Sequence, residues 1–146
     1  MMKLSTKGRY GVIAMYDLAM HAGDKEPISI KNVAERQEIS EHYLEQLMGQ
    51  LRKAGLVKST RGAQGGYFLA RSPKDVTVGD IIRVMEGPIA PVDCLLSTQK
   101  NDPHYCEKCE KCVTKGVWAK VAASISDVLD GITLEDLCRS EINEQE

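Results

Sequence analysis

The stretch ISEHYLEQLMGQLRKAGLVKSTRGAQGGYFLA, residues 39–70, decides the fold. Ser40 is a suitable helix N-cap, and the apolar residues after it recur at helical spacing until Gly55 ends the run. Leu56 to Ser59 and Tyr67 to Ala70 are strand-like, and the residues between them are rich in glycine. This pattern is typical of a β-hairpin. The segment therefore predicts a helix followed by a two-stranded hairpin.

Two further helices are predicted before this segment. Ser5 or Thr6 can cap a helix that stops at Gly23, and Ser29 can cap the sequence IKNVAERQ. The second of these and the helix after Ser40 flank a tight turn, which is a helix-turn-helix pattern. Helix-turn-helix followed by a hairpin predicts a winged helix, in which the helix after Ser40 reads DNA. The alternative is a small αβ domain of another purpose, but the basic hairpin tip favours the winged helix.

The C-terminal part predicts a helix that needs a partner. Thr77 and Asp80 form a capping box for a helix that ends at Gly87. From Val113 to Gly131 an apolar stripe runs along a helix of about 18 residues, roughly 27 Å long. A small domain cannot cover that length alone, which favours pairing with a second copy over a seam within one chain. Thr133 and Asp136 then cap a short closing helix, and the tail after it looks frayed.

Composition and charge fit a soluble protein with one nucleic-acid-binding half. The chain has 146 residues, of which 42% are hydrophobic and 27% charged, and no apolar run is long enough to span a bilayer. Residues 1–75 hold 12 Lys and Arg against 8 Asp and Glu, whereas residues 76–146 hold 7 against 13. Only the basic half suits contact with phosphate. We therefore expect a cytoplasmic protein that does not contact a membrane.

Four cysteines lie in a loop with little helical or strand pattern, at Cys94, Cys106, Cys109 and Cys112, with His104 nearby. Such a spacing allows thiolates to converge on one soft metal centre. Zinc and an iron–sulfur cluster both accept four sulfur-rich ligands, and the spacing does not choose between them. A thiol switch without metal is the third possibility. Cys138 stands alone and is expected to be a small buried apolar residue.

The expected fold is mainly α with a small β-hairpin wing, and it divides into four segments. These are a winged helix-turn-helix DNA-binding domain (1–74), a linker helix (75–90), a cysteine-rich cluster-binding loop (91–112), and a dimerisation helix with a C-terminal helix (113–146). An enzyme is not expected, because no nucleophile lies beside a base and no glycine-rich loop follows a strand to cradle phosphate.

Five stretches resemble the IscR-type family of bacterial regulators over nearly the whole chain: LSTKGRYGVIAMYDLA, ISEHYLEQLMGQLRKAGLVKSTRGAQGGY, VTVGDIIRVMEGP, CVTKGVW and ITLEDL. The resemblance implies a homodimeric winged-helix repressor or activator on a pseudo-palindromic operator, with an iron–sulfur cluster in the loop before the dimer helix. Members of the family sense a 2Fe-2S cluster and control cluster assembly, hold a nitric-oxide-reactive 4Fe-4S cluster, or lack cluster cysteines and govern cysteine metabolism. The loop cysteines argue against the last group and favour 2Fe-2S, with zinc as the alternative.

The resemblance also implies a ligand set. Cys94, Cys106 and Cys112 match the three ligating cysteines of the cluster-assembly group, but Lys115 stands where those proteins have a histidine ligand. An ammonium group cannot bind iron. The fourth ligand is therefore Cys109, His104 or a group from the partner subunit.

The same resemblance implies the DNA contacts. Gln46 can pair with adenine, Glu45 can accept from cytosine N4, and Arg61 in the wing suits a narrow minor groove. The remaining contacts implied are Ser40 and Tyr43 on the reader helix, and Ser5, Thr6, Lys7 and Arg9 against phosphate.

Overall fold

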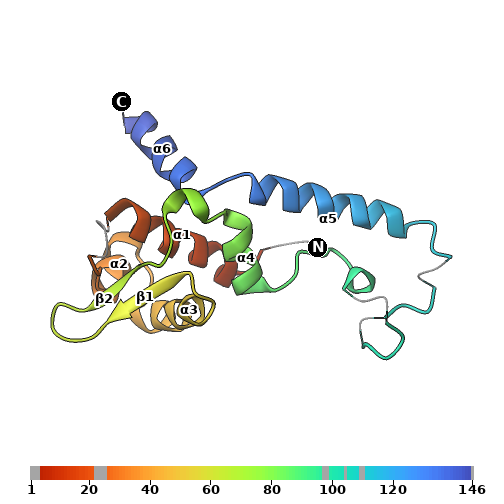
Figure 1. Cartoon of the computed structure of the whole chain (residues 1–146), viewed down its shortest axis with the longest axis horizontal. Coiled ribbons are helices and arrows are strands. Elements are labelled where there is room, and N and C mark those ends of the chain that lie inside the picture. Colours follow the sequence, from red (N-terminus) through yellow and green to blue (C-terminus); the bar gives the residue numbers. More distant parts are fainter. Residues whose placement is uncertain (1–3, 22–25, 97–98, 104, 109–110, 146) are drawn as a thin grey trace.

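The computed structural model describes residues 4–21, 26–96, 99–103, 105–108 and 111–145. In chain order the elements are α1 (Thr6–His21), α2 (Ile30–Gln37), α3 (Glu41–Lys53), β1 (Val57–Thr60), β2 (Gly66–Leu69), η1 (Pro73–Asp75), α4 (Val78–Glu86), η2 (Asp93–Leu95), α5 (Lys115–Asp130) and α6 (Leu134–Gln145). Figure 1 shows the first three helices and the hairpin gathered into one domain, from which α5 extends. The predicted mainly helical fold with a hairpin wing is confirmed.

The hairpin is attached to the helical domain by its second strand. β1 and β2 are antiparallel, with Val57 opposite Leu69 and Thr60 opposite Gly66. Ile28, in the extended piece before α2, exchanges two backbone hydrogen bonds of 2.8 Å with Tyr67. A Cβ on Gly66 would collide with the Ile28 carbonyl, so only glycine allows this close approach.

A partly buried ion pair joins α1 to α2. The Asp17 side chain is fully enclosed, and its carboxylate accepts two hydrogen bonds from Arg36, at 2.6 and 3.0 Å, and one from Gln37 at 2.8 Å. The bidentate contact raises the pKa of Arg36. All three groups are therefore satisfied, and the helix that precedes the turn is fixed against α1.

Helix α1 lies against α4 at two glycines. A Cβ on Gly11 would stand 2.7 Å from Met85 Cγ, and one on Gly8 would meet the Glu86 side chain. The Glu86 carboxylate accepts from the backbone N–H groups of Ser5 at 3.1 Å and Gly8 at 3.0 Å, and from the Ser5 hydroxyl. The last residue of α4 therefore caps the first turn of α1.

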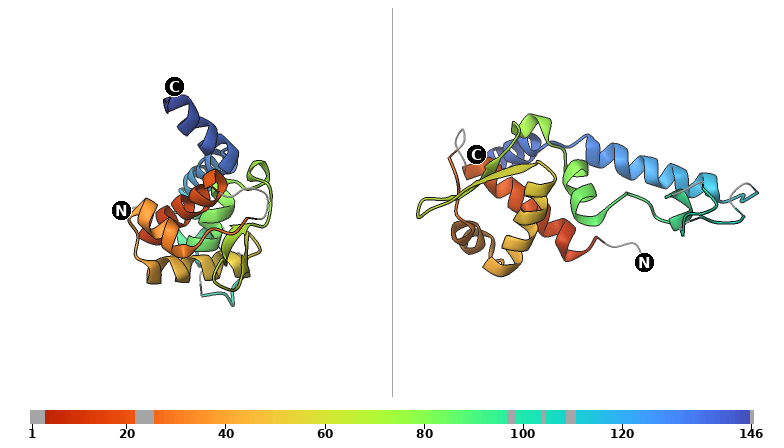
Figure 2. Two further views of the ribbon diagram at one scale, coloured as in Figure 1. Left: turned by 90° about the vertical axis from the view of Figure 1, so that its left-hand side faces the viewer. Right: turned by 60° about the horizontal axis from the view of Figure 1, so that its bottom comes forward.

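The helix α5, called here the arm, is attached at its C-terminal end. The Val78 N–H donates to the Ile132 carbonyl at 2.8 Å, and the Leu134 N–H donates to the Val76 carbonyl at 3.0 Å. A bidentate pair between Arg83 and Asp130, at 2.7 and 2.8 Å, lies at the same end. The right-hand view in Figure 2 shows the arm leaving the winged domain from this end.

Several boundaries differ from the sequence predictions. The strands start and end one residue away from the predicted positions, because Leu56 is buried at the end of the α3 turn and its N–H donates to the Leu51 carbonyl. The arm begins at Lys115 rather than Val113, and η2 was not predicted. Helix α6 continues to Gln145, through residues expected to fray. Among the described residues, no helix has the length and apolar character needed to cross a membrane.

Replacing Arg36 with methionine should lower the free energy of unfolding by about 3–5 kcal/mol, because it leaves the Asp17 carboxylate enclosed with Gln37 as its one remaining partner. Urea denaturation at a fixed protein concentration measures the loss. The matched control is Arg83→Met, which opens an equally bidentate pair whose side chains are 39% and 43% exposed, and it should cost far less. Equal losses in the two variants would contradict the structural role assigned to Asp17.

Candidate nucleic-acid interface and cysteine loop

The reader helix α3 has one buried and one exposed face. Leu44, Leu47, Met48 and Leu51 are buried against the other helices. The exposed polar residues of its first half are Glu41, His42, Glu45 and Gln46. Figure 1 shows α3 beside the hairpin, and the two elements are in contact. A single exposed surface therefore includes the start of α3 and the wing.

Two of the residues predicted to contact DNA also serve the fold. The Ser40 hydroxyl accepts from the Tyr43 N–H at 3.1 Å and so caps α3. The Tyr43 ring is partly buried and lies edge-on to Tyr10, with ring centroids 5.9 Å apart. This contact holds the first turns of α1 and α3 together, so that the predicted phosphate-binding residues lie near the reader helix.

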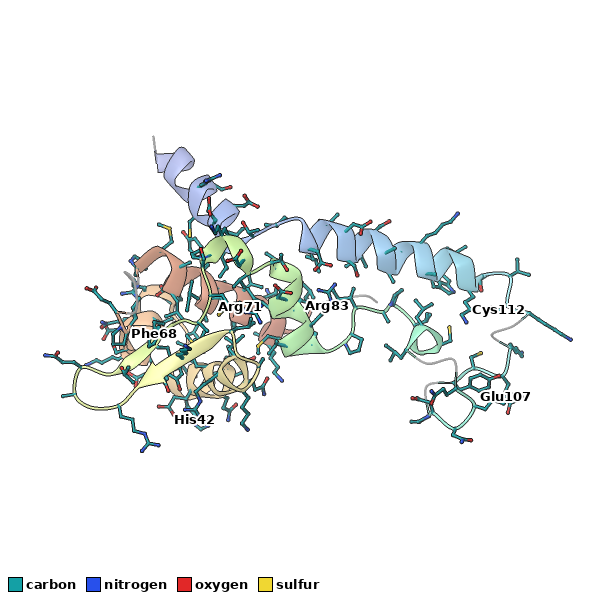
Figure 3. All side chains as sticks on the ribbon, viewed as in Figure 1. His42, Phe68, Arg71, Arg83, Glu107 and Cys112 are labelled. Carbon is teal, nitrogen blue, oxygen red and sulfur yellow. The ribbon has the colours of Figure 1, made fainter. Side chains whose placement is uncertain are left out.

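His42 is exposed on α3 and was missed as a site residue. Its Nε2 lies 3.3 Å from Nε2 of Gln46, one helical turn later. Figure 3 shows His42 on the outer side of α3, away from the domain core. The i, i+4 spacing of a histidine and a glutamine was the signal available in the sequence.

The hairpin tip carries Arg61, which is exposed. Gly62 has a φ of +106°, in the range that favours glycine, and the Gly65 N–H donates to the Gly62 carbonyl at 3.0 Å. At the base of the wing, Arg52 of α3 donates to the Ser59 hydroxyl at 3.4 Å. The structure thus holds the hairpin against α3 and leaves its tip free.

The start of α1 holds the four residues predicted to contact phosphate. Thr6 and Arg9 are exposed and Lys7 is partly buried. The amide and hydroxyl of Ser5 are instead engaged by Glu86. A phosphate at Ser5 would have to displace a carboxylate, so Lys7 and Arg9 are the better placed of the four.

The cysteine loop begins and ends near the arm. Cys94 lies in η2, which contacts α5, and Cys112 lies three residues before α5 begins. Figure 3 places Cys112 at the end of the arm that is distant from the winged domain. Cys106 is partly buried in the loop, while His104 and Cys109 lie outside the described residues. Among the described residues, no three His, Cys, Asp or Glu side chains are grouped to hold a metal.

The thiols differ in their suitability as ligands. The Thr114 hydroxyl lies 3.3 Å from Cys112 Sγ, and this hydrogen bond, supported by backbone N–H groups, lowers the pKa of Cys112. Burial on α6 raises the pKa of Cys138. A soft metal binds the thiolate, so the donor chemistry of the loop fits such a centre and that of Cys138 does not.

Comparison with known proteins identifies the family. Residues 4–140 match Rrf2, described as an iron-dependent transcriptional regulator. The transcriptional regulator CymR of Bacillus subtilis (strain 168) is 47% identical over 145 residues, which cover 99% of this chain and 96% of CymR. Its solved structure, described as that of the global cysteine regulator of B. subtilis, has a TM-score of 0.75 at 46% identity and covers 96% of this chain and 98% of that chain.

Proteins named IscR are similar over the same range. IscR of Aliivibrio salmonicida is 41% identical over 136 residues, which cover 93% of this chain and 77% of that protein. The solved structure of T. potens IscR has a TM-score of 0.77 at 53% identity and covers 99% of this chain and 92% of that chain. These relatives are named regulators, and the expectation that the chain is not an enzyme is confirmed. The chain belongs to the Rrf2 family of DNA-binding transcription regulators.

Proposed function

We propose that this regulator is a homodimer that binds a pseudo-palindromic operator and senses an iron–sulfur cluster, 2Fe-2S in preference to 4Fe-4S, to control genes of cluster biogenesis. One observation carries the DNA-binding part. The exposed polar face of α3 and the free tip of the wing lie on adjoining elements, with the basic start of α1 held beside α3 by the Tyr10–Tyr43 contact. This arrangement suits a reader helix in the major groove and a wing in the minor groove.

The residues divide by task. On α3, Gln46 and Glu45 offer the groups that read base edges, and Arg61 offers a guanidinium to the minor groove. Lys7 and Arg9 supply charge to the phosphates, which positions the protein without reading sequence. Ser40, Tyr43, Ser5 and Thr6 belong to the same surface, where Ser40 and Tyr43 also hold α3 in place.

Replacing Arg61 with alanine should weaken binding to a selected operator by about 1–3 kcal/mol, because a minor-groove contact is lost. Lys7→Ala should instead weaken all sequences alike. Fluorescence anisotropy at one salt concentration measures both. Arg71→Ala is the matched control: it removes the same charge from an exposed position after β2, away from the tip (Figure 3), and should have little effect. If Arg61→Ala binds the operator as tightly as the unchanged protein, the wing does not contact DNA.

The arm supports a homodimer. None of its residues is buried within the chain, and large apolar side chains stand exposed on it, among them Val117 at 51% and Val128 at 62%. An apolar groove of about 530 Å³ adjoins it, lined by residues of α4, the segment 87–91 and the end of α5. Exposed apolar surface on this scale favours a partner. A second copy is the economical occupant, because a symmetric pair of arms covers both stripes at once.

Val117→Glu and Val128→Glu should each convert the dimer to monomer, because both side chains are exposed in one chain and would be buried only by a partner. Sedimentation velocity measures the change. Ala119→Glu adds the same charge on the opposite side of the helix and should leave the dimer intact. An unchanged dimer in both valine variants would show that the arm is not the interface.

The loop supports the cluster. Cys94 lies in η2, which contacts α5, and Cys112 lies three residues before α5 begins, so both belong to segments that adjoin the arm, with Cys106 between them in the chain. These three would hold the cluster, and Cys109 or His104 would complete the set. The occupancy of such a cluster would depend on the supply of iron and on oxidants. The loop would then become ordered around its ligands.

Other functions of the same fold are distinguishable. A nitric-oxide- or redox-sensing 4Fe-4S regulator would use the same thiols, and a structural zinc would give a colourless protein. Near-complete coverage at 47% identity to CymR favours a cysteine-responsive regulator as the second candidate. Such a regulator needs no iron, but it assigns no function to the four cysteines of the loop. Iron content therefore separates the candidates.

Anaerobically purified protein should be brown, with iron and acid-labile sulfide, and Cys94→Ser, Cys106→Ser and Cys112→Ser should each lose the visible spectrum. Cys138→Ser is the control and should keep it, because Cys138 lies on α6, at the opposite end of the arm from the loop (Figure 1), and burial raises the pKa of its thiol. The spectra of Cys109→Ser and His104→Ala identify the fourth ligand. Colourless protein that carries zinc, or no metal at all, would overturn the cluster assignment.

A further inference from the structure

The geometry of α3 points to a task for His42 that the family resemblance does not include. Four exposed polar side chains occupy the first half of the reader helix, and two of them, His42 and Gln46, are in contact through their Nε2 atoms at 3.3 Å. The Ser40 hydroxyl caps α3, and the Tyr43 ring packs against Tyr10. The imidazole is therefore the neighbouring group on α3 that contacts the amide of Gln46.

The contact has a defined polarity. A carboxamide nitrogen carries two hydrogens and can only donate, so in this contact the Gln46 amide is the donor and Nε2 of His42 is the acceptor. Gln46 then keeps its oxygen and its second N–H free. This is the acceptor and donor pair that matches N6 and N7 of adenine in the major groove.

The opposite orientation presents a different pattern. If the partner at position 42 donated instead, the oxygen of Gln46 would face it, and both amide hydrogens would point away from the helix. Two donors match the O6 and N7 acceptors of guanine rather than the edge of adenine. The orientation of one amide group thus decides between two purines.

We propose that His42 is a positioning residue that holds the Gln46 carboxamide in the orientation that reads adenine. The i, i+4 spacing suits this role, because residues one turn apart are neighbours on a helix surface. A glutamine fixed before binding also loses less rotamer freedom when it meets the base. The proposal rests on the proposed function of α3 as the reader helix.

Three substitutions of His42 distinguish the positioning of Gln46 from an effect of the charge at position 42 on DNA affinity. An ionised glutamate can only accept, so His42→Glu should keep the preference for adenine at neutral pH while phosphate repulsion weakens binding to every duplex. Lysine can only donate, so His42→Lys should strengthen binding to every duplex and lose the preference for adenine over guanine. Alanine offers no partner, so His42→Ala should lose most of the preference with little effect on unspecific binding. His42→Glu should therefore lose affinity and keep specificity, whereas His42→Lys should gain affinity and lose specificity.

The experiment uses the full chain and four duplexes that differ in a single base pair. That base pair is the operator position at which Gln46→Ala removes the sequence preference. The unchanged protein should prefer adenine over guanine there by about 5- to 150-fold, and Gln46→Ala should abolish that preference. His21→Ala is the matched control, since His21 is exposed at the end of α1, and it should leave the preference unchanged. Because His42 is exposed, the thermal midpoints of the His42 variants should lie within a few degrees of that of the unchanged protein.

The outcomes distinguish this proposal from the function on which it rests. If the unchanged protein selects no sequence, the reader role of α3 fails. If it selects a sequence but His42→Ala and His42→Lys retain the adenine preference, His42 does not position Gln46. The positioning role also fails if Gln46→Ala leaves that preference intact, or if His42→Glu loses it together with His42→Lys.

Discussion

The enclosed carboxylate of Asp17 is the constraint on which the DNA-binding surface depends. A charge without contact to water requires partners in fixed positions, and Arg36 and Gln37 at the end of α2 supply them. Because those two residues come immediately before the turn into α3, the ion pair determines where the turn lies on α1. The direction of α3 then follows from this pair together with the Tyr10–Tyr43 contact and the buried apolar face of the helix.

Local features of the fold were predictable from the sequence because their causes are local. The hydroxyls of Ser29 and Ser40 cap the helices that follow them, and Thr77 and Thr133 form the predicted capping boxes with residues three positions later. Contacts between distant segments were not predictable. Nothing near Glu86 in the chain indicates that it caps α1, and nothing near Arg83 indicates that it pairs with Asp130, because both depend on how the helices pack.

The candidate site shows the same division. The sequence indicated which helix and which hairpin carry the exposed surface, since periodicity and glycines determine both. For Tyr43 it left DNA contact and core packing both open, and the structure shows the ring partly buried against Tyr10. His42 was not among the predicted contacts, although it is exposed on the same helix. For the loop, the spacing of the thiols indicates a soft metal, but the contact of η2, which holds Cys94, with the arm depends on how distant segments pack.

The way the arm is attached makes it a mechanical lever. Its backbone hydrogen bonds and its ion pair with Arg83 all lie at the end near the winged domain, and 16 residues of helix place the other end about 24 Å away. A tilt of roughly 10° at the attached end displaces the far end by about 4 Å. Conversely, a displacement of about 4 Å at the far end corresponds to a tilt of only roughly 10° at α4, the helix that contacts both the arm and α3. Such a rotation is small enough to leave the packing of the domain intact, and in a symmetric pair it would act twice, once on each half-site.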